Sequence, residues 1–79
     1  MELQLLNGTF NSNESIELVN KLFQVKIKFH EEKISKCNNE EDIKMRERKI
    51  KFLQNELAHI KEIINAKKED IFLYSKIII

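Results

Sequence analysis

The segment KCNNEED (Lys36–Asp42) divides a long helix-forming stretch of this sequence into two parts. Residues 13–68 contain no glycine or proline, so composition alone would allow one continuous helix. Asn38 suits the end of a helix because asparagine tolerates a left-handed backbone, and Asn39 suits the cap of the next helix. The three acidic residues that follow favour the positive end of that second helix. KCNNEED therefore predicts that one helix ends and another begins here.

The apolar residues change phase across this segment. Before it, the residues with heptad spacing form a first seam: Ile16, Phe23, Ile27, Ile34 and Cys37, with polar Asn20 and His30. After it, a second seam comprises Ile43, Ile50, Leu53, Leu57, Ile60 and Ile64, with polar Arg46. The seams are offset by two residues, about 200° around a helix, so one straight helix cannot carry both. We expect helices over 13–37 and 39–67, with Ser12 or Asn13 as the first cap, packed as an antiparallel coiled-coil hairpin.

Each expected helix also carries a second apolar line. These lines comprise Leu18, Leu22, Val25 and Phe29 in the first helix, and Met45, Phe52 and Ile63 in the second. One apolar stripe per helix is enough for a hairpin, so a second stripe predicts a further packing partner. That partner is either the chain's own strands or another subunit, and both are compatible with the pattern.

Residues 1–6 and 71–79 are expected to form strands. MELQLL alternates, with Leu3 and Leu5 on one face, and IFLYSKIII is rich in β-branched and aromatic residues. Asn7-Gly8 is typical of a hairpin turn, but only Thr9 and Phe10 precede the helix, so we expect a strand exit or a bulge. Because a helical hairpin brings its outer ends together, the two strands can pair antiparallel.

The predicted fold class is therefore α+β, mostly α, with the order β-α-α-β in a single small domain over residues 1–79. A two-stranded ribbon is marginal alone and its open edges favour pairing with another chain, so we expect a homodimer to complete the fold. A chain of 79 residues with one cysteine has few other sources of stability. The predicted dimer interface comprises Leu3, Leu5, Leu22, Phe29, Phe52, Phe72, Tyr74, Ile77, Ile78 and Ile79.

The sequence contains no recognisable motif for catalysis or for a cofactor. A single glycine cannot build a phosphate-cradling loop, and no nucleophile or dinucleotide fingerprint is present. The candidate metal ligands are His30, Cys37 and His59, but His30 and Cys37 lie about 10 Å apart along a helix and lack a chelating spacing. We expect no enzymatic activity, no metal site and no cofactor.

One feature of the second helix suggests a partner. Lys44, Arg48 and Lys51 share one helical face and are candidate phosphate contacts, although Glu47 interrupts the run and a Glu47–Lys51 pair would serve ordinary helix support. The main functional hypothesis is a non-enzymatic, homodimeric module for protein–protein interaction or scaffolding. The alternative is a small regulator that binds nucleic acid through this basic face.

Charge and hydropathy limit the partners further. The net charge is +1, which does not indicate nucleic acid or membrane as a partner of the whole molecule. The N-terminal residues lack a basic region and a cleavage site, and the longest apolar runs are too short to span a membrane. With one unpaired cysteine, a cytoplasmic protein without a membrane partner is the expectation.

Overall fold

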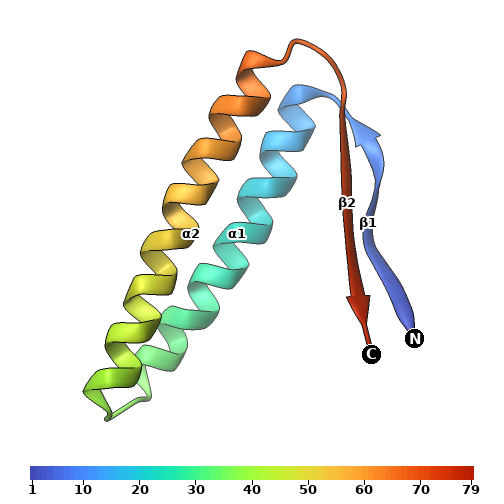
Figure 1. Cartoon of the computed structure of the whole chain (residues 1–79). Helices are drawn as coiled ribbons and strands as arrows, with labels where there is room; N and C mark the ends of the chain where they lie inside the picture. The colour runs from blue at the N-terminus through green and yellow to red at the C-terminus, as the bar shows by residue number, and fades with distance from the viewer.

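A computed structural model describes residues 1–79 and contains four elements. They are β1 (Glu2–Phe10), α1 (Ser12–Ser35), α2 (Glu40–Ala66) and β2 (Ile71–Ile78) (Figure 1). The order β-α-α-β and the antiparallel pairing of the two strands confirm the predicted fold class. β1 continues through Asn7 and Gly8 to Phe10, further than the expected strand, because both residues pair with β2.

Backbone hydrogen bonds and an asparagine cap form the turn between the helices. The amides of Lys36 and Cys37 donate to the carbonyls of Lys33 and Ile34, at 3.3 and 3.1 Å. These short-range bonds satisfy the end of α1, so no left-handed residue is needed, and the expectation of a left-handed Asn38 is wrong.

The asparagines that cap the two helices lie just before them. Asn39 caps α2, accepting hydrogen bonds from the amides of Glu41 and Asp42 at 2.9 and 3.4 Å. Asn11 caps α1, in place of the expected Ser12 or Asn13, because Asn11 and Glu14 form a reciprocal capping box. The Asn-x-x-Glu spacing is the sequence signal for this cap.

The core lies between α1 and α2, near the end where both strands join them. The buried residues Val19, Leu57 and Ile64 form its centre. Partly buried side chains of α1, α2 and β2 pack against this centre: Ile16, Phe23, Ile60, Ile71 and Leu73. Ile71 and Leu73 come from β2, so the base of the ribbon is anchored to the helical core. Ser15 is fully buried at the same end, and its hydroxyl donates to the carbonyl of Phe10 at 3.4 Å.

The β-ribbon contains one irregularity, which determines which side chains share a face. Its register shifts between Gln4 and Leu6, leaving Leu5 as the extra residue. Strict alternation would place Leu6 on the face opposite Leu3. The shift instead brings Leu6 to the face of Leu3, since their cross-strand partners Ser75 and Ile77 are two residues apart.

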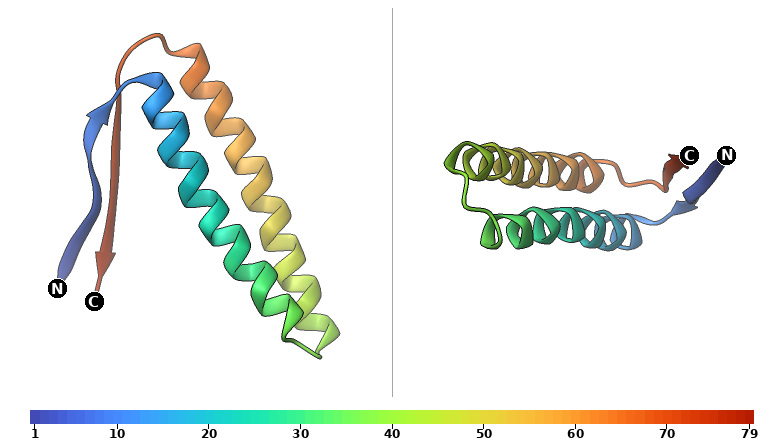
Figure 2. Two further views of the ribbon diagram at one scale, coloured as in Figure 1. Left: turned by 180° about the vertical axis from the view of Figure 1, so that it is seen from behind. Right: turned by 90° about the horizontal axis from the view of Figure 1, so that it is seen from below.

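The resulting apolar face of the ribbon comprises Leu3, Leu6, Phe10, Ile71, Leu73 and Ile77. It is packed only at its base. Ile71 and Leu73 contact the core, whereas Leu3 and Ile77, at the far end, are 48% and 45% exposed. Figures 1 and 2 show why: the ribbon and the hairpin meet at the connecting loops and diverge toward the chain ends.

The molecule is consequently thin and extended. Its principal extents are 46 × 33 × 13 Å, and its radius of gyration is 15.1 Å. A compact domain of this length has a radius of gyration of about 12 Å. Only six of the 79 residues are buried. The fold therefore forms essentially one layer, whereas a stable domain normally has at least two.

Replacement of Asn39 tests the role of the turn. Asn39→Ala removes the acceptor for two amides of α2 and is expected to lower the free energy of unfolding by about 1 kcal/mol. Asn38→Ala is the matched control and is expected to change it little. Urea denaturation followed by circular dichroism measures both. Equal losses in the two variants would contradict the assignment of Asn39 as the cap.

Candidate interaction surfaces

The predicted interface residues are accessible but do not lie on one surface. Leu22 is partly buried, and the other nine are exposed. Leu3 and Ile77 lie on the apolar face of the ribbon, while Ile78 belongs to its opposite face with Phe72 and Tyr74. Leu5 is the extra residue at the register shift of β1, and Ile79 lies just beyond the end of β2. The last three members belong to the helices: Leu22, Phe29 and Phe52. A single flat contact therefore cannot use all ten residues.

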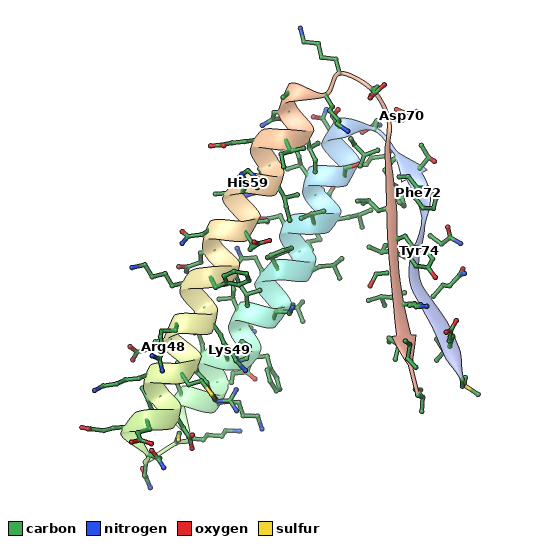
Figure 3. The ribbon with its side chains drawn as sticks, in the orientation of Figure 1. Arg48, Lys49, His59, Asp70, Phe72 and Tyr74 are labelled. Carbon is green, nitrogen blue, oxygen red and sulfur yellow. The ribbon has the colours of Figure 1, made fainter.

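The opposite face of the ribbon carries an aromatic pair. The rings of Phe72 and Tyr74 are stacked, with centroids 6.5 Å apart and planes inclined by 11°. Figure 3 places both on β2, far from Arg48 and Lys49 near the turn between the helices. The ribbon is thus apolar on one face and partly aromatic on the other. Because the sheet has only two strands, each strand also has an unpaired edge.

A polar contact joins α1 to α2 along their otherwise apolar seams. Arg46 Nη1 lies 3.0 Å from His30 Nδ1. Arginine can only donate, so Nδ1 must accept and a neutral ring carries its proton on Nε2. Partial burial lowers the pKa of His30 below 6.5, and the positive charges of Arg46, Lys49 and Lys26 lower it further. His30 is therefore neutral near pH 7, and its contact with Arg46 is compatible with the register of the two helices.

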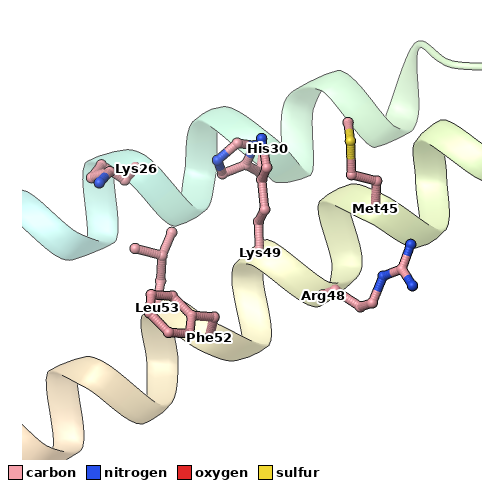
Figure 4. Close-up of a pocket in the computed structure, with 7 residues that line it drawn as sticks. All are labelled: Lys26, His30, Met45, Arg48, Lys49, Phe52 and Leu53. Carbon is pink, nitrogen blue, oxygen red and sulfur yellow. The ribbon is translucent and has the colours of Figure 1, made fainter.

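An open hollow of about 580 Å³ lies beside this contact, between α1 and α2 (Figure 4). We call it the interhelical hollow. Lys26 and His30 line it from α1, and the rest of its lining comes from α2: Met45, Arg48, Lys49, Phe52 and Leu53. No acidic residue lines it. Some of these residues stand out singly in the sequence, but their convergence does not, because the relative rotation of two helices cannot be read from either helix alone.

The predicted phosphate contacts lie together on α2. Lys44, Arg48 and Lys51 line a shallow hollow with Glu47. No ion pair forms between Glu47 and Lys51, because the only ion pairs within 4 Å are Lys21–Glu17 and Lys76–Glu2. The basic face is therefore accessible and its cations lack carboxylate partners.

The candidate metal ligands are not assembled into a site. No group of three or more His, Cys, Asp or Glu side chains is placed to hold a metal ion. Cys37 is partly buried at the tip of the hairpin, where its Sγ accepts a hydrogen bond from the amide of Asn39 at 3.5 Å. That contact gives Cys37 a structural position in the turn. Neither helix is apolar enough over a sufficient length to cross a bilayer.

The titration of His30 yields a prediction about stability and pH. In the unfolded state His30 binds a proton near pH 6.5, whereas in the folded state its pKa is lower. The unfolded state therefore gains protons first, and the free energy of unfolding should fall as pH decreases through 6.5. Glutamine retains an acceptor for Arg46 but does not titrate, so His30→Gln should weaken this pH dependence. Urea denaturation at pH 7.5 and 5.5 measures it, with His59→Gln as the control for loss of a histidine. If His30→Gln keeps the pH dependence of the intact chain, His30 is not the source of that dependence.

Comparison with known proteins does not assign a family. No protein-family model, no curated protein and no solved structure matches the chain.

Proposed function

We propose that the chain is a non-enzymatic protein–protein interaction or scaffolding module that assembles as a homodimer. The observation that carries this proposal is the excess of exposed surface. The accessible area is 6333 Å², whereas a folded monomer of 9.5 kDa exposes about 5,000 Å². The excess of about 1,300 Å² exceeds the roughly 800 Å² that each partner contributes to a standard interface.

The distribution of apolar side chains supports the ribbon as the main contact. Of the thirteen exposed large hydrophobic side chains, eight belong to the ribbon and the terminal residues beside it: Met1, Leu3, Leu5, Phe72, Tyr74, Ile77, Ile78 and Ile79. Apolar surface on this scale is normally covered by a partner. A two-stranded ribbon also gains most from pairing, because it is marginal alone and has two open edges.

A second copy of the chain would cover the exposed apolar side chains and would pair with the open edges of the ribbon. It supplies a second layer for a molecule whose thinnest extent is 13 Å, and it supplies strands with the same open edges. Two ribbons joined edge to edge would form a four-stranded sheet with helices on it. The chain's own dimensions thus favour self-association over a contact confined to the helices.

Sedimentation velocity tests the dimer and its location. The intact chain should be a dimer at micromolar concentration, and Ile78→Lys should weaken the dimer at least tenfold by placing a charge in the apolar contact. Val25→Lys is the matched control, because Val25 and Ile78 are both 68% exposed but Val25 lies on α1. A well-folded monomer of the intact chain would refute the proposal. Equal effects of the two substitutions would refute the ribbon as its site.

Deletion of residues 77–79 complements the substitution. It removes two of the cross-strand partners of β1 as well as the exposed isoleucines, so it should weaken assembly markedly. Ile78→Lys keeps the backbone pairing and separates loss of the interface from loss of the ribbon. An unchanged, stable dimer after the deletion would exclude these residues from the interface.

The second candidate function is binding of nucleic acid through α2. The supporting observation is that Lys44, Arg48 and Lys51 lie together and none has a carboxylate partner. Backbone phosphates are suitable partners for such a group of exposed cations. Nucleic-acid binding ranks second for two reasons. The acidic Glu47 lies among the three cations, and no further side chain suited to reading bases lines the same hollow.

Fluorescence anisotropy with mixed-sequence DNA and RNA oligonucleotides tests this second candidate. Binding at low salt should weaken as salt increases, and Lys51→Glu should reduce the salt dependence by about one released counterion. Lys28→Glu makes the same charge change on α1 and should preserve binding. No binding at low salt would remove this function.

A further inference from the structure

The positive charges around the interhelical hollow have no partners within the chain. Lys26 approaches it from α1, and Arg48 and Lys49 approach it from α2. None of the three lies within 4 Å of a carboxylate, since the only ion pairs are elsewhere. Burial lowers the pKa of His30, and the positive charges of Arg46, Lys49 and Lys26, which surround its ring, lower it further. An anion placed there would offset these charges.

The same hollow exposes apolar surface. Phe52 is 62% exposed although it belongs to a helix of a folded chain, and Met45 is also exposed beside the hollow. Buried Leu53 lines the hollow next to Phe52 (Figure 4). In this view Phe52 and Leu53 lie toward one end of the hollow, while the side chain of Lys49 extends from α2 toward His30. Lys26 lies beside this apolar end, Lys49 is nearer the middle, and Met45 and Arg48 lie toward the other end.

This combination of cationic and apolar side chains restricts the ligand. A free inorganic anion would satisfy the cations and leave Phe52 and Met45 in water, whereas a neutral apolar molecule would desolvate the cations without pairing them. The volume of about 580 Å³ falls within the range of small-molecule sites. We propose that the interhelical hollow binds a small amphipathic anion, in which a phosphate or carboxylate is joined to an apolar chain or ring.

In this arrangement Lys49 and Lys26 hold the anionic group between the two helices. Arg48 adds a third donor on α2, and its planar guanidinium suits a phosphate or a carboxylate. The apolar part of the ligand extends over Leu53 and against the ring of Phe52. The ligand would thus contact both helices, and this inference does not depend on dimerisation.

Titration of the full-length chain with octyl phosphate, below its critical micelle concentration, tests the proposal. Isothermal calorimetry should show binding at least tenfold tighter than for inorganic phosphate, octyl glucoside or octyltrimethylammonium. Inorganic phosphate lacks the tail, octyl glucoside lacks the charge, and octyltrimethylammonium reverses it. Equal affinity for any of the three would overturn the proposal, because the hollow would then recognise only one part of the ligand or neither.

The ring signals of His30 report where the ligand binds. Octyl phosphate should raise the pKa of His30, because its charge offsets those facing the ring: Lys26 from α1, and Arg46 and Lys49 from α2. Proton nuclear magnetic resonance measures this change, with the His59 signals as the internal reference. Binding detected by calorimetry without a change in the His30 titration would place the ligand elsewhere and overturn the site.

Substitutions distinguish specific binding in the interhelical hollow from nonspecific attraction of an anion to positive side chains. Lys49→Glu should weaken octyl phosphate binding about tenfold or more, since a charge pair is replaced by a like-charge contact. Phe52→Ala should weaken octyl phosphate binding by removing the exposed ring. Lys28→Glu, also on α1, should leave binding unchanged, and circular dichroism confirms that each variant is folded. Equal losses in Lys49→Glu and Lys28→Glu would overturn the proposal.

The source of the anion is tested separately. Vesicles of phosphatidylcholine with phosphatidic acid present the same chemistry at a membrane surface. The proposal expects octyl phosphate to bind as a free molecule and these vesicles not to retain the chain in co-sedimentation. Retention by vesicles in the absence of any octyl phosphate binding would overturn a small-molecule site.

Discussion

The apolar contact between α1 and α2 supports every other feature of this structure. Val19, Leu57 and Ile64 close the hairpin at the end where the strands join the helices, and β2 adds Ile71 and Leu73 to the same contact. The buried Ser15 hydroxyl also holds the end of β1 through the carbonyl of Phe10, so the direction of the ribbon is determined at its base. The same helix pair creates the interhelical hollow on its flank. Both candidate surfaces therefore depend on the packing of α1 against α2.

Much of this fold could be predicted from the sequence, because the phase change across KCNNEED forces two helices and thereby brings the chain ends together. The ribbon was harder to predict in detail. Alternation in MELQLL does not reveal that Leu5 is an extra residue, since a register shift depends on the partner strand. Asn7-Gly8 is typical of a turn, yet pairing with β2 keeps both residues extended. Tertiary pairing overrides the local signal at both places.

The candidate surfaces were predictable as residues but not as assemblies. Exposed apolar residues such as Phe29 and Phe72 were identified from their patterns, and the structure places them on the expected helix and strand. By contrast, Lys26 and Lys49 lie twenty-three positions apart, and only the register of the hairpin brings them to one hollow. The His30–Arg46 contact is part of that register. Sequence periodicity defines the face of one helix, whereas a site between helices requires their relative rotation.

The ribbon has a consequence for the order in which the chain folds. The amino group of Met1 donates to the carbonyl of Ile79 at 2.8 Å, and the amide of Ile79 donates back to Met1 at 2.7 Å. These contacts join residues 78 positions apart, so their closure entropy is large until the helices have already brought the ends together. The hairpin should form first and the strands should pair last. During that interval the isoleucine-rich end is uncovered, which makes the encounter with a second chain a competitor of correct strand pairing.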